Sequence, residues 1–309
     1  MLSRIAESLF WIGRYIERSD GTARILDVYL QLLLEDIFVD EDTACRALLG
    51  VMGSEAPEDR SLTRTDVISA LATDRGNTAS IAYSVRAARE NARRAREIIS
   101  TELWEVLNTT HTGMPQRVSG GKVHELFSWV RERSALATGI ADSTSSRDDA
   151  WRFFTLGRSI ERADMTARLL ATRALTEASG PSWTTILRSV GAYEAYLRTY
   201  RGVPSSTNAA EFLLLDRLFP RSILHSLTLA EQCLRDIDPQ RERIGYQDRA
   251  VRMLGRIRAE LEFRPISEII EELPIIMDRV QSTTTSVSNA VKERYFPTHT
   301  LPAWMGGQS

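Results

Sequence analysis

The residues of this 309-residue chain best suited to chemistry form two groups of acidic and arginine side chains with the same spacing. Carboxylate and guanidinium groups placed this closely can form two-point ion pairs, bind an anionic or peptide-like ligand, or exchange a proton with a substrate. The first group consists of Arg14, Glu17, Arg18, Asp20 and Arg24. The second group consists of Arg158, Glu161, Arg162, Asp164 and Arg168.

Both groups lie within matching 17-residue segments. Residues 10–26 and 154–170 are identical at 11 of 17 positions, with an offset of 144. A weaker match, Ser80-Ile81 with Ser222-Ile223, follows at an offset of 142. This pattern predicts a duplicated helical unit. The charged positions match as well as the apolar ones, although surface substitutions are nearly neutral. We therefore expect the charged face to be constrained by something that it contacts.

Local ion pairs are the first interpretation of this face. Asp20 and Arg24 have i,i+4 spacing, and Arg14 lies three residues before Glu17. Each such pair stabilises a helix by only about 0.2–0.5 kcal/mol. That is too little to maintain the matched residue types.

Contact between the two helices is the second interpretation, and we favour it. If the segments face each other across a pseudo-two-fold axis, Glu17 meets Arg162 and Glu161 meets Arg18. Breaking one buried ion pair costs about 3–5 kcal/mol, which is enough to constrain the residues.

A cleft is the third interpretation, and it can coexist with the second if the network forms the cavity floor. In a cleft, Glu17 and Glu161 are candidate acid or base groups. The candidate ligand-binding residues are Arg14, Arg18, Asp20, Arg24, Arg158, Arg162, Asp164 and Arg168.

Another charged stripe lies between the two groups, at Arg86, Arg89, Arg93 and Arg96. These arginines share a helical face and can bind phosphate or carboxylate. We favour intrahelical pairing with neighbouring glutamates over ligand binding.

Several function classes have little support in the sequence. The net charge of −2 makes nucleic acid a poor partner. The four histidines are scattered, and no metal or nucleotide-binding motif is present, so we expect no metal and no cofactor. Cys45 and Cys233 show no paired spacing, which is typical of a reducing cytosol. Without an apolar run of about 18 residues, we expect a cytoplasmic chain that does not span a membrane.

Helical periodicity must position all of these residues, and no segment alternates with period two. We therefore predict an all-α, multi-helix bundle built from two related halves, residues 1–120 and 121–296, in a single domain over 1–309. The predicted helices include 4–35, 78–107 and 147–178, with a polar loop over 108–121. Residues 297–309 are predicted to form a flexible tail.

The repeated G-R-x-I-E-R-x-D-x-T-A-R block resembles the Alpha-E domain family of bacterial helical proteins. The resemblance covers essentially the whole chain and includes residues 88–93, 193–196, 211–216 and 219–222. It implies an association with a circularly permuted ATP-grasp ligase, and often with a transglutaminase-like protein. The motif positions are Glu17, Arg18, Asp20, Arg24, Glu161, Arg162, Asp164 and Arg168, with Arg89, Asn91 and Arg93 as a second block.

The function we predict is that of an accessory protein, which binds such a ligase or its peptide-like or anionic ligand through the Glu-Arg helix faces. One alternative is an enzyme that uses Glu17 or Glu161 as acid or base in an arginine-lined cleft. Another is a purely structural helical homodimer.

Overall fold

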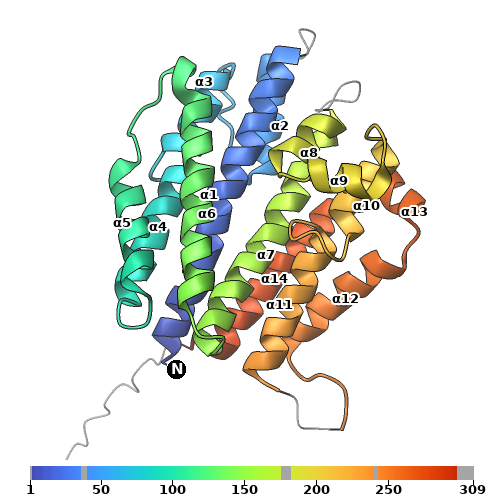
Figure 1. Cartoon of the computed structure of the whole chain (residues 1–309). Helices are drawn as coiled ribbons and strands as arrows, with labels where there is room; N and C mark the ends of the chain where they lie inside the picture. Colours follow the sequence, from blue (N-terminus) through green and yellow to red (C-terminus); the bar gives the residue numbers. More distant parts are fainter. Residues whose placement is uncertain (1, 36–39, 175–181, 240–242, 298–309) are drawn as a thin grey trace, which may run out of the picture.

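We describe the protein from a computed structural model, which covers residues 2–35, 40–174, 182–239 and 243–297 (Figure 1). These residues form fourteen α-helices and contain no strand, which confirms the all-α prediction. None of the described helices is long and apolar enough to cross a membrane. The helices are α1 (Ser3–Glu35), α2 (Glu41–Val51), α3 (Arg64–Ile68), α4 (Ile81–Arg94), α5 (Thr101–Gly113), α6 (Val123–Thr144), α7 (Asp149–Ala171), α8 (Trp183–Ser189), α9 (Tyr193–Tyr200), α10 (Ser206–Leu215), α11 (Ile223–Ile237), α12 (Arg249–Phe263), α13 (Ile266–Glu271) and α14 (Leu273–Tyr295).

Helices α1 and α7 lie side by side at the centre of the molecule (Figure 1). Helices α4 and α6 pack on α1, and α5 packs on both of them. Helices α11 and α14 pack on α7 in the same way, and α12 packs on both of them. The two motif helices are thus each enclosed by a similar set of neighbours. The neighbours of α1 include α6, which lies beyond residue 120, the predicted end of the first half.

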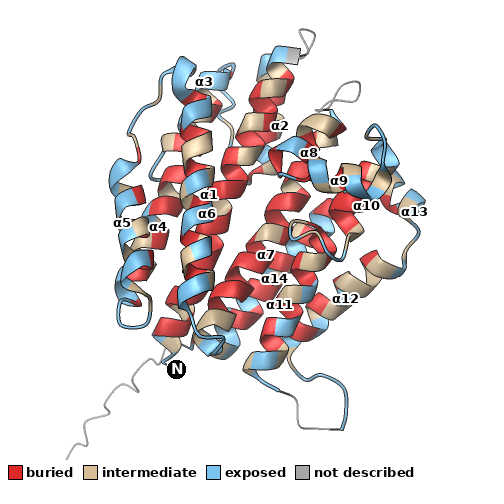
Figure 2. Cartoon of the chain, viewed as in Figure 1, coloured by how far each residue is buried: buried red, intermediate tan, exposed pale blue. Residues whose placement is uncertain are grey.

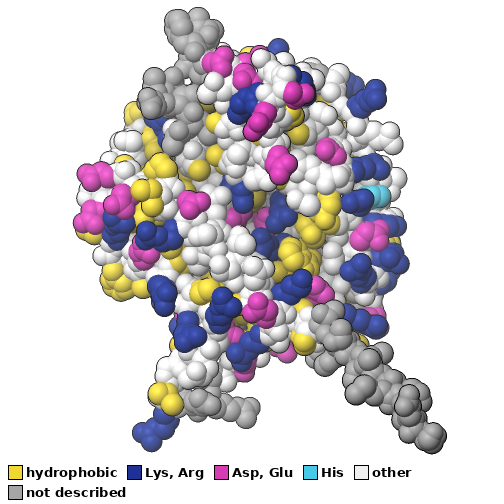
Figure 3. All heavy atoms as spheres, turned by 180° about the vertical axis from the view of Figure 1, so that it is seen from behind, with side chains coloured by type: hydrophobic (Ala, Val, Ile, Leu, Met, Phe, Trp, Pro, Cys, Tyr) yellow, Lys and Arg dark blue, Asp and Glu magenta, His cyan; other side chains and the backbone are white. Residues whose placement is uncertain are grey.

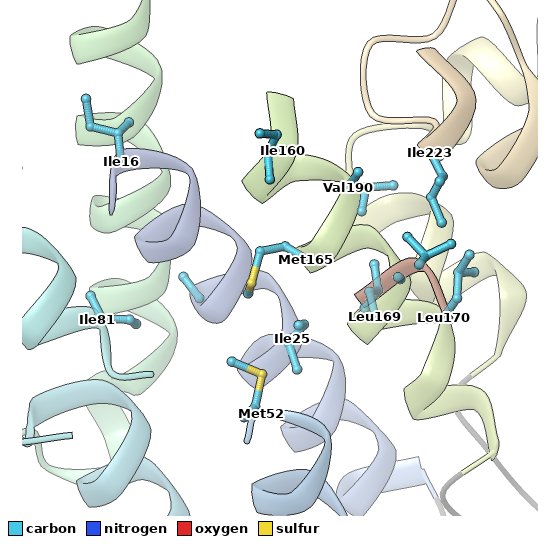
Figure 4. Packing of buried hydrophobic residues seen from close by; sticks show 14 of the residues in the cluster. Ile16, Ile25, Met52, Ile81, Ile160, Met165, Leu169, Leu170, Val190 and Ile223 are labelled. Atoms are coloured by element: carbon cyan, nitrogen blue, oxygen red, sulfur yellow. The ribbon is translucent and has the colours of Figure 1, made fainter. Parts of the chain in front are cut away.

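This central position buries α1 and α7 on almost every face (Figure 2). Their apolar stripes form one hydrophobic cluster, in which Ile16 and Ile25 of α1 and Ile160 and Met165 of α7 take part (Figure 4). A helix enclosed on all sides must also bury its polar face. Their charged groups are therefore drawn into the interior, where they need partners.

The predicted helix 78–107 is wrong, because the chain forms two helices there. Helix α4 ends at Arg94, and α5 starts after Ser100. The Ser100 backbone is extended, and its side chain accepts a hydrogen bond from the Leu103 N–H, which starts a new helix. Helix α5 then runs to Gly113, so the predicted loop 108–121 is also wrong at its beginning.

Helix α7 begins slightly later than predicted, because Asp148 caps its first turn by accepting from the Ala150 and Trp151 N–H groups. Its regular part ends at Ala171, and a 3-10 turn follows at Thr172–Ala174. The predicted end at residue 178 and most of the predicted tail, 298–309, lie outside the described residues.

Candidate functional site

The backbones of α1 and α7 touch at two glycines, Gly13 and Gly157. A Cβ atom on Gly13 would collide with the Phe154 carbonyl oxygen, and one on Gly157 would collide with the Phe10 carbonyl oxygen. Further along, Gly21 lies against the Met165 side chain. Because these contacts advance together along both helices, α1 and α7 run in the same direction. Their close approach brings the two charged faces together.

Glu17 and Glu161 each pair with an arginine of the opposite motif helix. Arg162 donates from Nε and Nη2 to the two carboxylate oxygens of Glu17, at 2.9 and 2.6 Å. Arg18 donates to Glu161 in the same two-point manner, with Nη2 at 3.0 Å from Oε2. The side chains of Glu17 and Glu161 are 3% and 0% exposed. The predicted pairing of Glu17 with Arg162 and of Glu161 with Arg18 is therefore confirmed.

A further arginine binds each glutamate, but from different places in the sequence. Arg14 of α1 reaches Glu161 and Ser288, instead of forming the intrahelical pair with Glu17 that its spacing predicts. Its counterpart is Arg158, whose Nη1 lies 3.2 Å from Oδ2 of Asp142. The second arginine on Glu17 is one that the sequence patterns did not single out.

That residue is Arg221, which precedes the capping residue of α11. Its Nη1 lies 2.6 Å from Oε1 of Glu17, and its Nη2 lies 2.8 Å from Oδ2 of Asp20. The match of Ser80 with Ser222 is the sequence signal that could have identified Arg221, since it aligns Arg221 with Ala79.

Arg24 and Arg168 connect each motif helix to the other half of the molecule. Each forms the predicted i,i+4 pair, Arg24 with Asp20 at 2.8 Å and Arg168 with Asp164 at 2.7 Å. Arg24 also donates to the carbonyl of Ser189, the last residue of α8. Arg168 likewise donates to the carbonyl of the last residue of α2, Val51. Each guanidinium thus stabilises the negative end of a helix that follows the opposite motif.

The surrounding arginines keep both glutamates ionised. Burial raises the pKa of Glu161, but Arg14 and Arg18 outweigh it and lower the pKa to about 2. Burial also raises the pKa of Glu17, and Arg162 and Arg221 reverse it to well below the ordinary 4.5. Near neutral pH, these carboxylates are ionised. They bind the surrounding guanidinium groups and carry no proton to donate.

The network is open on one side, at a cavity of about 200 Å³. Four of the predicted site residues line it, namely Arg18, Glu161, Asp164 and Arg168. Met52, Met165 and Ala79 form part of its walls. Glu17 does not line this cavity, so the two glutamates do not share it.

The second predicted block, Arg89, Asn91 and Arg93 on α4, lies apart from this cavity. Arg89 and Arg93 both bind Glu90, the latter at 3.1 Å, and Asn91 donates to the Ala87 carbonyl at 2.8 Å. Arg89 also stacks over the ring of Trp104 on α5. The expected intrahelical pairing with a glutamate is confirmed for Arg89 and Arg93, whereas Arg86 and Arg96 lie over the rings of Tyr83 and Trp104. On the face shown in Figure 3, acidic and basic side chains are interspersed.

The chain is similar to a family of known proteins. The sequence model of the Alpha-E family, described as a predicted alpha-helical domain with a conserved ER motif, matches residues 1–296. An uncharacterized protein of Mycobacterium bovis is 25% identical over 262 residues, which cover 76% of this chain and 30% of that protein. Uncharacterized proteins of two Mycobacterium tuberculosis strains are 25% and 24% identical, with the same coverage. The chain thus spans 30% of the length of these curated relatives. No solved structure matches it.

Proposed function

This chain belongs to the Alpha-E family, and on that premise we propose that it is a non-catalytic accessory protein of an ATP-grasp-type amide or peptide ligase. The observation that carries the proposal is the length of the relatives, of which this chain matches 30%. In those proteins the matched region is part of a much longer polypeptide. We propose that this domain acts together with such a ligase, with a transglutaminase-like protein as a further partner.

The contacts of the Glu-Arg residues support a binding role over a catalytic one. Glu17 and Glu161 are buried, ionised and each held by two arginines, so neither is poised as an acid or base at neutral pH. We propose that ligand contact is limited to the cavity residues Arg18, Glu161, Asp164 and Arg168. Of the other predicted ligand-binding residues, Arg14 and Arg162 hold the two motif helices together, and Asp20, Arg24 and Arg158 bind neighbouring segments. The cavity also favours a binding protein over a purely structural dimer.

Copurification tests the accessory role. We expect the tagged chain to retain the ATP-grasp ligase of the same organism, and the ligase to form amide bonds faster in its presence. The matched variants are Ala79→Arg, which places a large side chain at the cavity, and Ala135→Arg, which adds the same charge on an exposed face of α6. A ligase that neither binds the chain nor responds to it would reject the proposal.

We also infer that the helices α1 to α6 and α7 to α14 are two related units that arose by duplication. The support is the matched packing of neighbouring helices on α1 and α7. In addition, Gly13 and Gly157 make equivalent contacts with the backbone of the other motif helix, and Arg24 and Arg168 make equivalent hydrogen bonds to helix ends. In a crystal structure, α1, α2, α4, α5 and α6 should superpose on α7, α8, α11, α12 and α14 in one rotation. Failure of that superposition would contradict the duplication.

A further inference from the structure

The two sides of the Glu-Arg network differ at one position, which is Arg221 on one side and Ala79 on the other. The contacts around these two residues correspond. Thr22 donates to the Ala79 carbonyl at 3.3 Å, and Thr166 donates to the Arg221 carbonyl at 3.1 Å. The preceding residues correspond too, because Arg18 donates to the Thr78 carbonyl and Arg162 to the Pro220 carbonyl. Ala79 therefore occupies the place of Arg221, without its side chain.

On the occupied side, the Arg221 guanidinium lies between two carboxylates. Oε1 of Glu17 contacts both Nε of Arg162 and Nη1 of Arg221. Oδ2 of Asp20 contacts both Nε of Arg24 and Nη2 of Arg221. Each of these oxygens therefore accepts from two arginines.

On the cavity side, the corresponding oxygens each accept from one arginine among the described residues. Oε1 of Glu161 accepts from Nε of Arg18, and Oδ2 of Asp164 accepts from Nε of Arg168. A carboxylate oxygen has two lone pairs, so each retains one acceptor position. The side chain of Glu161 is fully buried and that of Asp164 is 6% exposed. Both residues line the cavity of about 200 Å³ next to Ala79.

We propose that this cavity binds a guanidinium group, with Glu161 and Asp164 as its acceptors. Arg221 provides the internal template, since its two terminal nitrogens bind the matching pair of carboxylates. The cavity is smaller than the roughly 300–1,000 Å³ of sites for drug-sized molecules, and it suits an arginine side chain or a compound of that size. Met52 and Met165 supply apolar walls, and Figure 4 shows Met165 extending from α7 toward α1.

The local charge makes an anion the main competitor for this cavity. Arg14, Arg18 and Arg168 outnumber Glu161 and Asp164 by one positive charge. The side that holds Arg221 has this excess with its guanidinium in place, from Arg24, Arg162 and Arg221 against Glu17 and Asp20, whereas a guanidinium bound in the cavity raises the excess there to two. Gly53, just after the C-terminal end of α2, also lines the cavity, and this helix end contributes partial negative charge.

The inference concerns the cavity of the proposed function, but it does not require the ligase. The guanidinium can belong to an arginine side chain of a partner polypeptide or to a free small molecule. Binding of a small probe to the isolated chain therefore tests the cavity, and copurification tests the partnership, so that either can fail alone.

Calorimetric titration with methylguanidinium is the first test. We expect saturable binding of one molecule per chain, at least about tenfold tighter than binding of methylammonium at equal ionic strength. Ala79→Arg should abolish this binding, and Ala135→Arg should retain it. Binding that survives in Ala79→Arg, tighter binding of acetate or phosphate, or no saturable binding of methylguanidinium would overturn the proposal.

Arg221→Ala gives an independent test, because it empties the template position. We expect the number of bound methylguanidinium molecules to rise from one to two, and the lost thermal stability to be partly restored by the probe. An unchanged stoichiometry without restoration would count against the proposal. Nα-acetylarginine methylamide then distinguishes the sources. If it binds like methylguanidinium, a polypeptide arginine can enter the cavity, and if it does not, the site takes the free compound.

Discussion

Glu17 of α1 and Arg162 of α7 form a two-point ion pair across the centre of the molecule, with N–O distances of 2.9 and 2.6 Å. Glu17→Gln removes the negative charge and leaves Arg162 and Arg221 buried without it. We expect the free energy of unfolding to fall by about 3–5 kcal/mol, the cost of breaking a buried ion pair. Urea denaturation followed by circular dichroism measures this loss, and Glu161→Gln should show a similar one.

Glu90→Gln is the matched control, because Glu90 also binds two arginines but its side chain is 38% exposed. Its loss should be about 0.2–1 kcal/mol per pair, the usual value for exposed ion pairs. If Glu17→Gln folds as stably as the wild type and abolishes an activity, the chain is an enzyme and the network is its active site.

Gly13→Ala and Gly157→Ala test the close contact between α1 and α7. In an exposed helix, glycine to alanine stabilises by about 1 kcal/mol. At Gly13 and Gly157 the new Cβ would collide with a backbone carbonyl oxygen of the other helix, so we expect destabilisation instead. Gly139→Ala on α6 has open space around its Cβ and should be stabilising. A similar change in thermal midpoint for all three variants would contradict the backbone contact.

Arg24 and Arg168 predict a crossed pattern of hydrogen exchange. Arg168→Met removes the donor to the Val51 carbonyl, so the C-terminal turn of α2 should exchange faster. Arg24→Met removes the donor to Ser189 and should affect the end of α8. Mass-spectrometric hydrogen exchange of both variants measures these effects. If each variant increased hydrogen exchange equally at the ends of α2 and α8, the two contacts would not act separately.

Part of this site could be predicted from the sequence because both copies of the motif carry the same charges. Matched charges on two helices are explained by mutual contact, and the pairing of Glu17 with Arg162 followed from that reasoning. The i,i+4 pair of Asp20 with Arg24 depends only on helical spacing, so it was predictable too. The all-α fold followed from periodicity alone.

Arg221 and Arg14 show why the rest could not be predicted. Arg221 corresponds to Ala79, so a search for matched charges passes over it, and its contact depends on how the segment before α11 packs against α1. Arg14 had a suitable partner within its own helix, yet it binds Glu161, because α7 lies close enough to offer a buried carboxylate. Which carboxylate an arginine binds depends on how distant segments pack together, and this packing cannot be read from the spacing of residues along the chain.

The pKa of Glu161 predicts how stability depends on pH. Its pKa falls from the ordinary 4.5 to about 2 on folding, because Arg14 and Arg18 outweigh the effect of burial. The unfolded chain therefore takes up this proton first as the pH falls. The free energy of unfolding contributed by Glu161 is present above pH 4.5 and is lost between pH 4.5 and about 2. Glu17 should extend the loss to lower pH, since its folded pKa lies lower still.

Urea midpoints measured from pH 7 to pH 2.5 test this dependence. Burial lowers the pKa of His111 and His225 from the ordinary 6.5, so protonation of the unfolded histidines decreases stability from about pH 6.5 downward. Glu161→Gln separates the two effects, because it leaves the histidines unchanged. Its stability should fall less steeply than that of the wild type below pH 4.5 and in parallel with it above pH 5. Equal slopes below pH 4.5 would mean that Glu161 is not held ionised by Arg14 and Arg18, and the account of the buried network would have to be abandoned.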